Sequence, residues 1–248
     1  MSTTIKYIPK SIFSDWVGLI ESSSIKTGDR EKIYGMLEYS YKLLDENCND
    51  FQRIDIISNL RRIISKRVQT IFNTYKIDNV EFKIGNDKKF EKLERLQLVK
   101  PLLLHELLKI RNGVEYNDKK PPSVNKLKKL IDTTWYFIRS TDIYVSNIPN
   151  TILFEHHNEK HWLEVDYNFK NKWSFEVRGW VSQNKIYNSQ KINTFKLQLT
   201  DLHNKKECFN PKNHKNKLLT DFYIRGKIDI QGEEKIDFIS LYFAKFYL

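Results

Sequence analysis

Cysteine, glycine and proline are all scarce in this chain, which has 2, 8 and 6 of them among its 248 residues. Cys48 and Cys208 are too few and too far apart for a disulfide framework or a cysteine-ligated metal site. That cysteine usage fits a reducing cytoplasm. The glycines form neither a Walker-type nor a dinucleotide-binding loop, and no nucleophile elbow is present. We therefore expect no bound cofactor and no metal.

Long apolar runs are also missing. No stretch approaches the roughly 20 apolar residues that a membrane-spanning helix needs. The segment MSTTIKYIPKSIFSDW has no uninterrupted apolar core followed by a small-residue cleavage site, so we do not expect a secretory signal. The composition, 40% hydrophobic and 29% charged, is typical of a folded globular chain. These features predict a cytoplasmic protein without a membrane partner.

Basic residues outnumber acidic ones along the whole chain. The formal net charge is +11, with 26 Lys and Arg against 19 Asp and Glu in residues 1–143, and 16 against 12 in residues 144–248. A positive surface favours an anionic partner such as RNA, DNA or a nucleotide.

The first half has the hydrophobic period of helices. In residues 51–77 the apolar side chains recur every three or four positions, as in an amphipathic helix, and the opposite face carries Arg62 and Lys66. We expect helices over residues 11–23, 29–47, 51–77, 90–112 (kinked or split at Pro101) and 121–142. Short connections between them predict an antiparallel bundle.

After residue 146 the period changes to two. We expect strands over residues 161–169, 173–183 and 192–202, and a hairpin over residues 221–243 that turns at Gln231-Gly232. The fold class is therefore α+β, with a helical bundle over residues 1–146 and a mostly antiparallel β-rich domain over residues 147–248. Six aromatic residues of this half either stack on bases or fill the core: Trp162, Trp173, Phe175, Trp180, Phe195 and Phe222.

The stretch RNGVEYND sits between the last two expected helices and is unusually polar for a simple connection. Arg111 is expected to close the first of them, with Asn112 as a cap and Glu115 as an ion-pair partner of Arg111. A guanidinium at that place can bind phosphate in a bidentate way. The alternative is a surface ion pair that contributes under about 1 kcal/mol.

An apolar helix, then Arg111-Asn112, then a further helix, within a basic helical region, resembles the HEPN (higher eukaryotes and prokaryotes nucleotide-binding) domain family. The resemblance covers the N-terminal half only. It implies a homodimer through the bundle, with two motifs in one cleft, and a metal-independent endoribonuclease of antiviral defence or toxin–antitoxin systems. It further implies an antitoxin or defence-system partner, and Arg111 on the scissile phosphate. Lys119 and Lys120, with Arg62 and Lys66, are the expected RNA contacts.

One residue departs from the family pattern, because Tyr116 stands where the motif has His. Tyrosine, with an ordinary pKa of about 10, is a poor general base near neutrality. Tyr116 is then expected to contact substrate, with Asn112 and Glu115 positioning Arg111. The departure favours an alternative function, a catalytically inactive HEPN-like binding or regulatory module.

Two other constellations are open in the second half. His156, His157 and His161 lie close in sequence, but neighbouring strand residues point to opposite faces, which disfavours a shared metal. A metal-dependent DNA nuclease needs Asp, a spacer and Glu-x-Lys on adjacent strands. The possible sets are Asp221 with Glu233 and Lys235, or Asp166 with Glu176 and Arg178.

Overall fold

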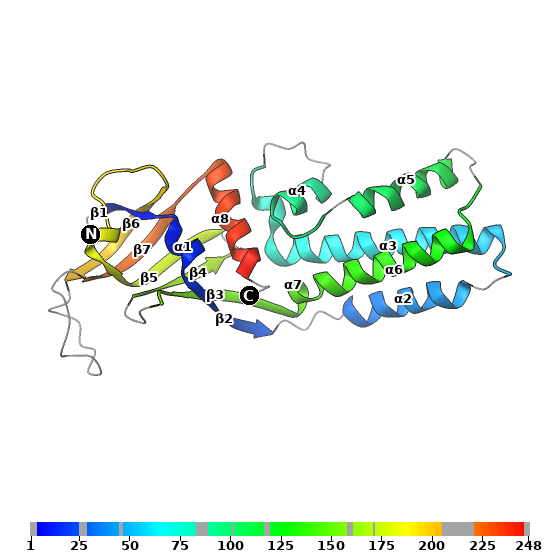
Figure 1. Cartoon of the computed structure of the whole chain (residues 1–248), viewed down its shortest axis with the longest axis horizontal. Coiled ribbons are helices and arrows are strands. Elements are labelled where there is room, and N and C mark those ends of the chain that lie inside the picture. Colours follow the sequence, from blue (N-terminus) through cyan, green and yellow to red (C-terminus); the bar gives the residue numbers. More distant parts are fainter. Residues whose placement is uncertain are drawn as a thin grey trace. The chain divides into compact units, whose positions relative to one another are not determined.

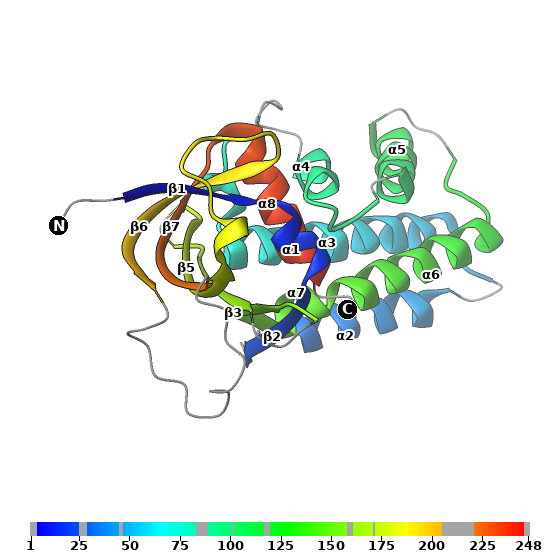
Figure 2. The same ribbon diagram turned by 60° about the vertical axis from the view of Figure 1, so that its left-hand side comes forward.

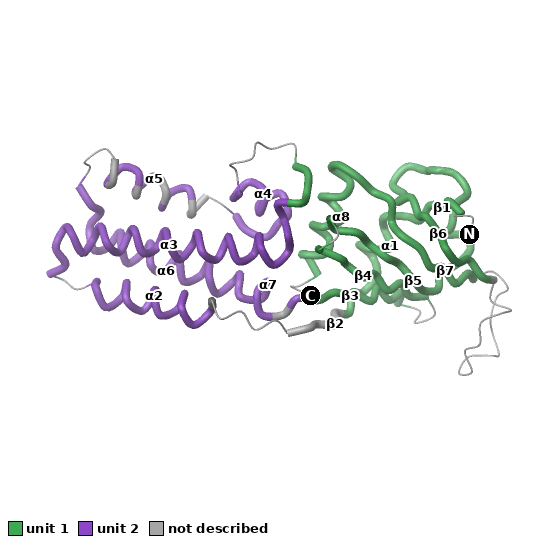
Figure 3. Tube along the Cα trace, turned by 180° about the vertical axis from the view of Figure 1, so that it is seen from behind, with its two compact units in different colours: residues 1–23, 79–82, 149–248 green, residues 24–78, 83–148 purple. Residues whose placement is uncertain are grey.

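The computed structural model describes residues 4–24, 29–44, 47–82, 89–100, 102–116, 120–157, 161–170, 172–204 and 221–245. The chain divides into two compact units (Figure 3). Residues 1–23, 79–82 and 149–248 form one, here named the sheet unit. Residues 24–78 and 83–148 form the other, the helical unit. The class is mixed α/β, as the sequence predicted in outline (Figure 1). The sequence predicted a domain boundary between residues 146 and 147, with residues 1–23 in the helical bundle. In the structure residues 1–23 belong to the sheet unit.

Of the helix predicted over residues 11–23, only residues 11–15 are helical, and the prediction is wrong for residues 17–23. The chain instead forms strand β1 (Thr4–Pro9), a short helix α1 (Ser11–Asp15) and strand β2 (Val17–Ser24). Helix α1 ends because Trp16 takes an extended backbone, with φ −84° and ψ 145°. Its apolar residues do face a core, since the Phe13 ring lies 5.0 Å from that of Phe238. Pairing within a sheet overrides the helical spacing of residues 17–23.

The helical unit contains six α-helices in its described residues. They are α2 (Asp29–Leu43), α3 (Asp50–Tyr75), α4 (Lys89–Arg95), α5 (Leu102–Tyr116), α6 (Val124–Thr141) and α7 (Ile143–Ser146), and a 3-10 turn, η1 (Ile77–Asn79), follows α3. A capping box of Asn49 and Gln52 starts α3, and the Ser123 hydroxyl accepts a hydrogen bond from the Lys126 amide at the start of α6. The predicted split of the fourth helix is confirmed, since α4 and α5 are separate.

The long helix α3 buries the predicted apolar stripe, including Ile57, Leu60 and Ile71. It also buries a cation that the sequence did not single out. Arg67 is 1% exposed, and its Nη2 donates to Asp142 Oδ1 at 2.6 Å, at the end of α6. The Tyr34 hydroxyl of α2 donates to the other Asp142 oxygen at 2.6 Å. This polar cluster joins α2, α3 and α6 inside the unit.

The sheet unit holds a seven-stranded sheet in the order β1-β6-β7-β5-β4-β3-β2. The strands not yet named are β3 (Asn147–Glu155), β4 (Trp162–Asn168), β5 (Ser174–Ser182), β6 (Thr194–Asn204) and β7 (Asp221–Asp229). Every pairing with a defined register is antiparallel. A 3-10 turn, η2 (Gln183–Lys185), follows β5.

The predicted hairpin over residues 221–243 is wrong, because β7 is followed by helix α8 (Gly232–Ala244). Gly232, at φ +56°, makes the turn into the helix. Helix α8 buries residues at helical spacing, among them Ile236, Ile239 and Phe243. Helices α8 and α1 lie on the same side of the curved sheet (Figure 2). Trp173, Phe175 and Phe195 belong to this aromatic core and are not available to bases.

No helix in the described part of the chain combines the length and the apolar character needed to cross a membrane.

Candidate functional site

The face of the sheet opposite α8 carries polar and aromatic side chains. Strict alternation produces this face, because every second residue of β4 and β5 is buried against the helix. The intervening residues therefore form rows that cross neighbouring strands, and their order follows from the strand register.

The first row is aromatic. Trp162 on β4 lies opposite Trp180 on β5, Trp180 opposite Tyr223 on β7, and Tyr223 opposite His203 on β6. All four side chains are partly exposed. The rings of Trp180 and Tyr223 are 5.6 Å apart and inclined by 66°. We name these four residues the aromatic row.

The second row, one step along the strands, is charged. Glu164 lies opposite Arg178, Arg178 opposite Arg225, and Arg225 opposite Asp201. Arg178 Nη2 donates to Glu164, and this hydrogen bond raises the pKa of the Arg178 guanidinium. Among the described residues, the Arg225 side chain forms no ion pair or hydrogen bond, and it is exposed. We name these four residues the arginine row.

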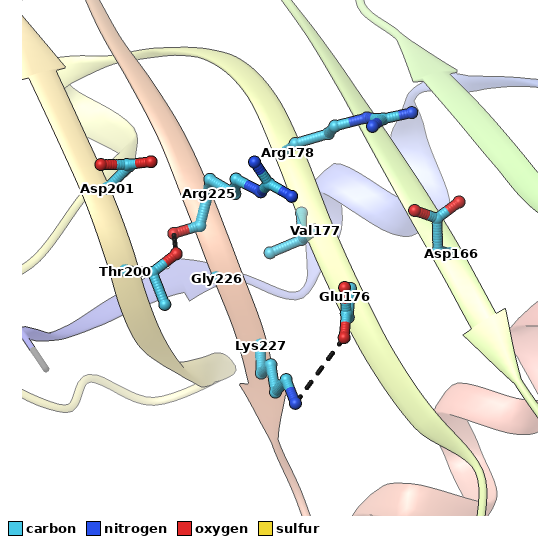
Figure 4. A pocket seen from close by; sticks show the side chains of 9 residues that line it. All are labelled: Asp166, Glu176, Val177, Arg178, Thr200, Asp201, Arg225, Gly226 and Lys227. Carbon is cyan, nitrogen blue, oxygen red and sulfur yellow. Dashed lines mark hydrogen bonds and ion pairs between the residues drawn. The ribbon is translucent and has the colours of Figure 1, made fainter. Parts of the chain in front are cut away.

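A third row follows, in which Asp166 lies opposite Glu176 and Glu176 opposite Lys227. The Thr151 hydroxyl donates to Asp166 at 2.6 Å, and Lys227 Nζ lies 3.6 Å from Glu176. Between the arginine row and this third row the sheet is hollowed by about 280 Å³ (Figure 4). In Figure 4 Arg178 points away from Arg225, and Arg225 extends over the hollow. The lining residues are Asp166, Glu176, Val177, Arg178, Thr200, Asp201, Arg225, Gly226 and Lys227.

Two glycines bring the strands together under this surface. Gly179 has φ +147°, and a Cβ there would lie 2.1 Å from the Trp162 carbonyl oxygen. A Cβ on Gly226 would lie 2.4 Å from the Gln198 carbonyl oxygen, beside the irregularity in β6 between Leu199 and Asp201. Such bulges re-aim side chains next to binding sites. Gly226 is paired with Val177 and Leu199, whose side chains are buried on the other face, so the glycine lets β6 and β7 approach closely beneath the hollow.

The surface combines aromatic rings, several carboxylates and the guanidinium of Arg225, which has no side-chain partner among the described residues. Rings stack on planar groups, a guanidinium binds phosphate or a purine edge, and carboxylates accept from amino groups. Within the residues that the structure describes, no group of three or more His, Cys, Asp or Glu side chains could hold a metal ion.

The predicted motif around Arg111 lies in a different local structure from the one expected. Helix α5 runs to Tyr116, so Arg111 does not close it and Asn112 does not cap it. Asn112 is exposed. The side chains of Arg111, Glu115 and Tyr116 lie outside the described part of the structure.

The four predicted RNA contacts belong to the helical unit. Arg62 is exposed and Lys66 partly exposed, one turn apart on α3. Lys120 is exposed just before α6, and Lys119 lies outside the described residues. No described contact brings these four side chains together.

The nuclease constellations have different outcomes. Asp221 begins β7 whereas Glu233 follows its far end, so the two lie at opposite ends of a nine-residue strand about 30 Å long. Asp221 instead lies 3.2 Å from His161 Nε2, and Lys235 Nζ donates to the Lys172 carbonyl. Asp166 and Glu176 do meet, with Arg178 in the next row. Two carboxylates therefore lie side by side there, and within the described residues no group of three or more metal-ligating side chains forms.

The three histidines gather at the turn between β3 and β4. The rings of His156 and His157 are 3.8 Å apart, and those of His156 and His161 are 6.1 Å apart.

Comparison of the chain with protein-family models, with curated proteins and with solved structures finds no matching family, protein or structure.

Proposed function

We propose that the protein binds single-stranded RNA on the outer face of its sheet, with the aromatic row stacking on bases. The observation that carries this proposal is the register that aligns Trp162, Trp180, Tyr223 and His203 across four strands. An antiparallel sheet with exposed rings on neighbouring strands is a recurrent way to hold unpaired bases. Stacking on one aromatic ring contributes about 1 to 3 kcal/mol per base.

The arginine row lies beside the rings and supplies contacts that stacking lacks. Arg225 is positioned to meet a phosphate or the edge of guanine. Glu164 and Asp201 flank the guanidinium groups, and carboxylates accept from the amino groups of cytosine and guanine. The arginine row, with both cations and carboxylates, therefore suits a single strand of RNA whose bases are splayed onto the sheet.

The long-range attraction comes from the rest of the chain. The helical unit contains 24 Lys and Arg against 16 Asp and Glu, a net charge of +8 of the total +11. A field of this sign raises the rate of encounter with a polyanion. The three rows on the sheet hold three cations and four carboxylates, so the contribution of this face is recognition of bases and not long-range attraction.

The direct test is fluorescence anisotropy with a labelled single-stranded RNA in EDTA, comparing wild type with Trp180→Ala. We expect about tenfold weaker binding of the variant. Ile192→Ala is the control, because Ile192 is 93% exposed in the same unit and lies outside the rows. Equal affinities of wild type and Trp180→Ala for RNA would refute a role of the aromatic row in RNA binding.

Cleavage of the bound RNA is a separate proposal that rests on the family resemblance. Arg111, Asn112, Glu115 and Tyr116 occupy the last turns of α5, where Arg111 and Glu115 are one turn apart. A HEPN-like metal-independent endoribonuclease would use Arg111 on the scissile phosphate in a homodimer. The catalytically inactive binding module, with Tyr116 in place of the base, is the alternative.

A further inference from the structure

Helix α6 of the helical unit exposes a stripe of aromatic and basic side chains. The stripe consists of Lys128, Lys129, Asp132, Trp135, Tyr136 and Arg139, all exposed, and is named the α6 stripe. Spacings of three and four residues place them on one face of the helix. The stripe is about 16 Å long from Lys128 to Arg139.

The two rings in the middle of the stripe are open to solvent. Tyr136 is 68% exposed and Trp135 is 37% exposed. Their ring centroids are 5.0 Å apart and the planes are inclined by 85°. The core face of α6 is formed by Leu127, Ile131 and Ile138, so Tyr136 and the exposed part of Trp135 lie outside it. Neighbouring exposed rings offer two faces for stacking.

The charge of the stripe is positive. Three cations and one carboxylate give a net charge of +2. The carboxylate is already engaged, since the Tyr41 hydroxyl of α2 donates to Asp132 at 2.7 Å. Glu38, one turn before Tyr41, pairs with Lys42 at 2.8 Å. The Arg139 guanidinium contacts the Tyr34 hydroxyl. This hydroxyl is neutral, so the contact does not cancel the positive charge of Arg139.

We propose that the α6 stripe binds single-stranded RNA, with Trp135 and Tyr136 stacking on bases and Lys128, Lys129 and Arg139 contacting phosphates. Charge complementarity selects this occupant. A second copy of the chain docked by a two-fold axis would set the same positive stripe against itself, and like charges repel. A polyanion gains from every cation and from both rings.

The α6 stripe stands on observations independent of the sheet. It belongs to the other unit, and its rings and cations are separate from the aromatic row. Two RNA-binding surfaces in one chain would strengthen binding of a long strand beyond either surface alone.

The test measures binding of a labelled oligouridylate of about 12 nucleotides by the full-length protein in EDTA. Trp135→Ala/Tyr136→Ala is expected to bind about tenfold more weakly than wild type. Tyr39→Ala is the control, because Tyr39 is 51% exposed on α2 and lies about half a turn around that helix from Tyr41. Equal weakening in the Tyr39 variant would overturn the assignment to the stripe.

The cations give a second readout. Lys128→Gln/Lys129→Gln is expected to reduce the slope of log affinity against log salt by about 1.4, because each phosphate contact on a single strand contributes about 0.7. Lys32→Gln, on the face of α2 away from Tyr41, is expected to leave the slope unchanged.

Unchanged affinity and slope in both stripe variants would overturn the proposal. A changed molar mass in light scattering with unchanged RNA affinity would also overturn it, by assigning the stripe to a protein contact. Trp180→Ala, measured in parallel, separates the two surfaces. Loss of binding in that variant alone would refute the α6 stripe and support the aromatic row.

Discussion

Trp162 on β4 lies directly opposite Trp180 on β5, on the face of the sheet that α8 leaves uncovered. Gly179 makes that pairing possible, since any side chain there would meet the Trp162 carbonyl oxygen at 2.1 Å. The aromatic row therefore depends on a residue without functional groups of its own.

Gly179→Ala is expected to destabilise the protein by about 2 kcal/mol or more. The alanine would have to adopt φ +147° and displace the backbone of β4. Urea unfolding, followed by tryptophan fluorescence, measures the change in the free energy of unfolding.

Gly35→Ala is the control for that experiment. Gly35 lies in α2 with no atom within 4 Å of an added Cβ. Alanine in a helix interior is expected to stabilise by about 0.5 to 1 kcal/mol. Similar losses at both glycines would contradict the argument from close approach.

Asp142→Asn is expected to destabilise the protein by about 3 to 5 kcal/mol, because it leaves the 1% exposed Arg67 guanidinium without a counter-charge. Chemical denaturation measures the loss. Glu38→Gln removes an exposed ion pair with Lys42 and is expected to leave the unfolding midpoint unchanged. A loss under about 1 kcal/mol for Asp142→Asn would contradict this role of Asp142 as the counter-charge of Arg67.

Periodicity predicted those elements whose apolar residues all face one core. Helices α2, α3 and α6 and strands β4, β5 and β6 were expected near their observed positions. The two wrong assignments, residues 11–23 and 221–243, are segments where strand and helix adjoin without a long turn. Pairing with strands that are distant in the sequence determines the secondary structure of such segments, and the local hydrophobic pattern does not indicate that pairing. The N-terminal strand β1 pairs with β6, some 190 residues later in the chain.

The rows on the sheet could be predicted only in part. The alternation in residues 161–169 and 173–183 shows that Trp162, Trp180 and Arg178 avoid the core face. It does not show which residue lies opposite which, because register depends on turn geometry and on the crossing from β5 to β7. The pairing of Tyr223 with Trp180 could therefore not be predicted from the sequence, nor could the ion pair of Arg67 with Asp142.

The raised pKa of Tyr41 predicts that the folded protein loses stability at high pH. Burial and the hydrogen bond to Asp132 raise the pKa of Tyr41 from 10.0 to about 12. Below pH 10 folded and unfolded chains both keep the proton, and the stabilisation is complete. Between pH 10 and about 12 the unfolded chain releases it first, so stability falls. Tyr41→Phe is expected to be less stable at pH 8 and to show a shallower decline in urea midpoint across that range. An equal decline in both proteins would contradict this role.

Arg225 and Arg178 should differ in their effect on RNA binding. Arg225 lacks a partner among the described residues, whereas Arg178 is bound to Glu164. Arg225→Gln is expected to lower the slope of log affinity against log salt by about 0.7, as one lost phosphate contact does. Arg178→Gln is expected to change it less. A larger change of slope for Arg178→Gln than for Arg225→Gln would place the bound RNA on the side of the hollow nearer to β4.

Arg111→Ala separates cleavage from binding. If the cleavage proposed for the Arg111 motif occurs, RNA is cut in EDTA. The variant then loses about 100-fold or more of the cleavage rate, because a charge that stabilises the transition state is gone. Tyr116→Phe keeps the ring and removes the hydroxyl, so its loss measures any proton transfer or hydrogen bond by that group. Labelled RNA resolved on a denaturing gel gives the rates, and anisotropy on the same samples gives the affinity. Absence of cleavage by wild type, with RNA binding retained, would establish the inactive binding module and leave the sheet face and the α6 stripe as the functional surfaces.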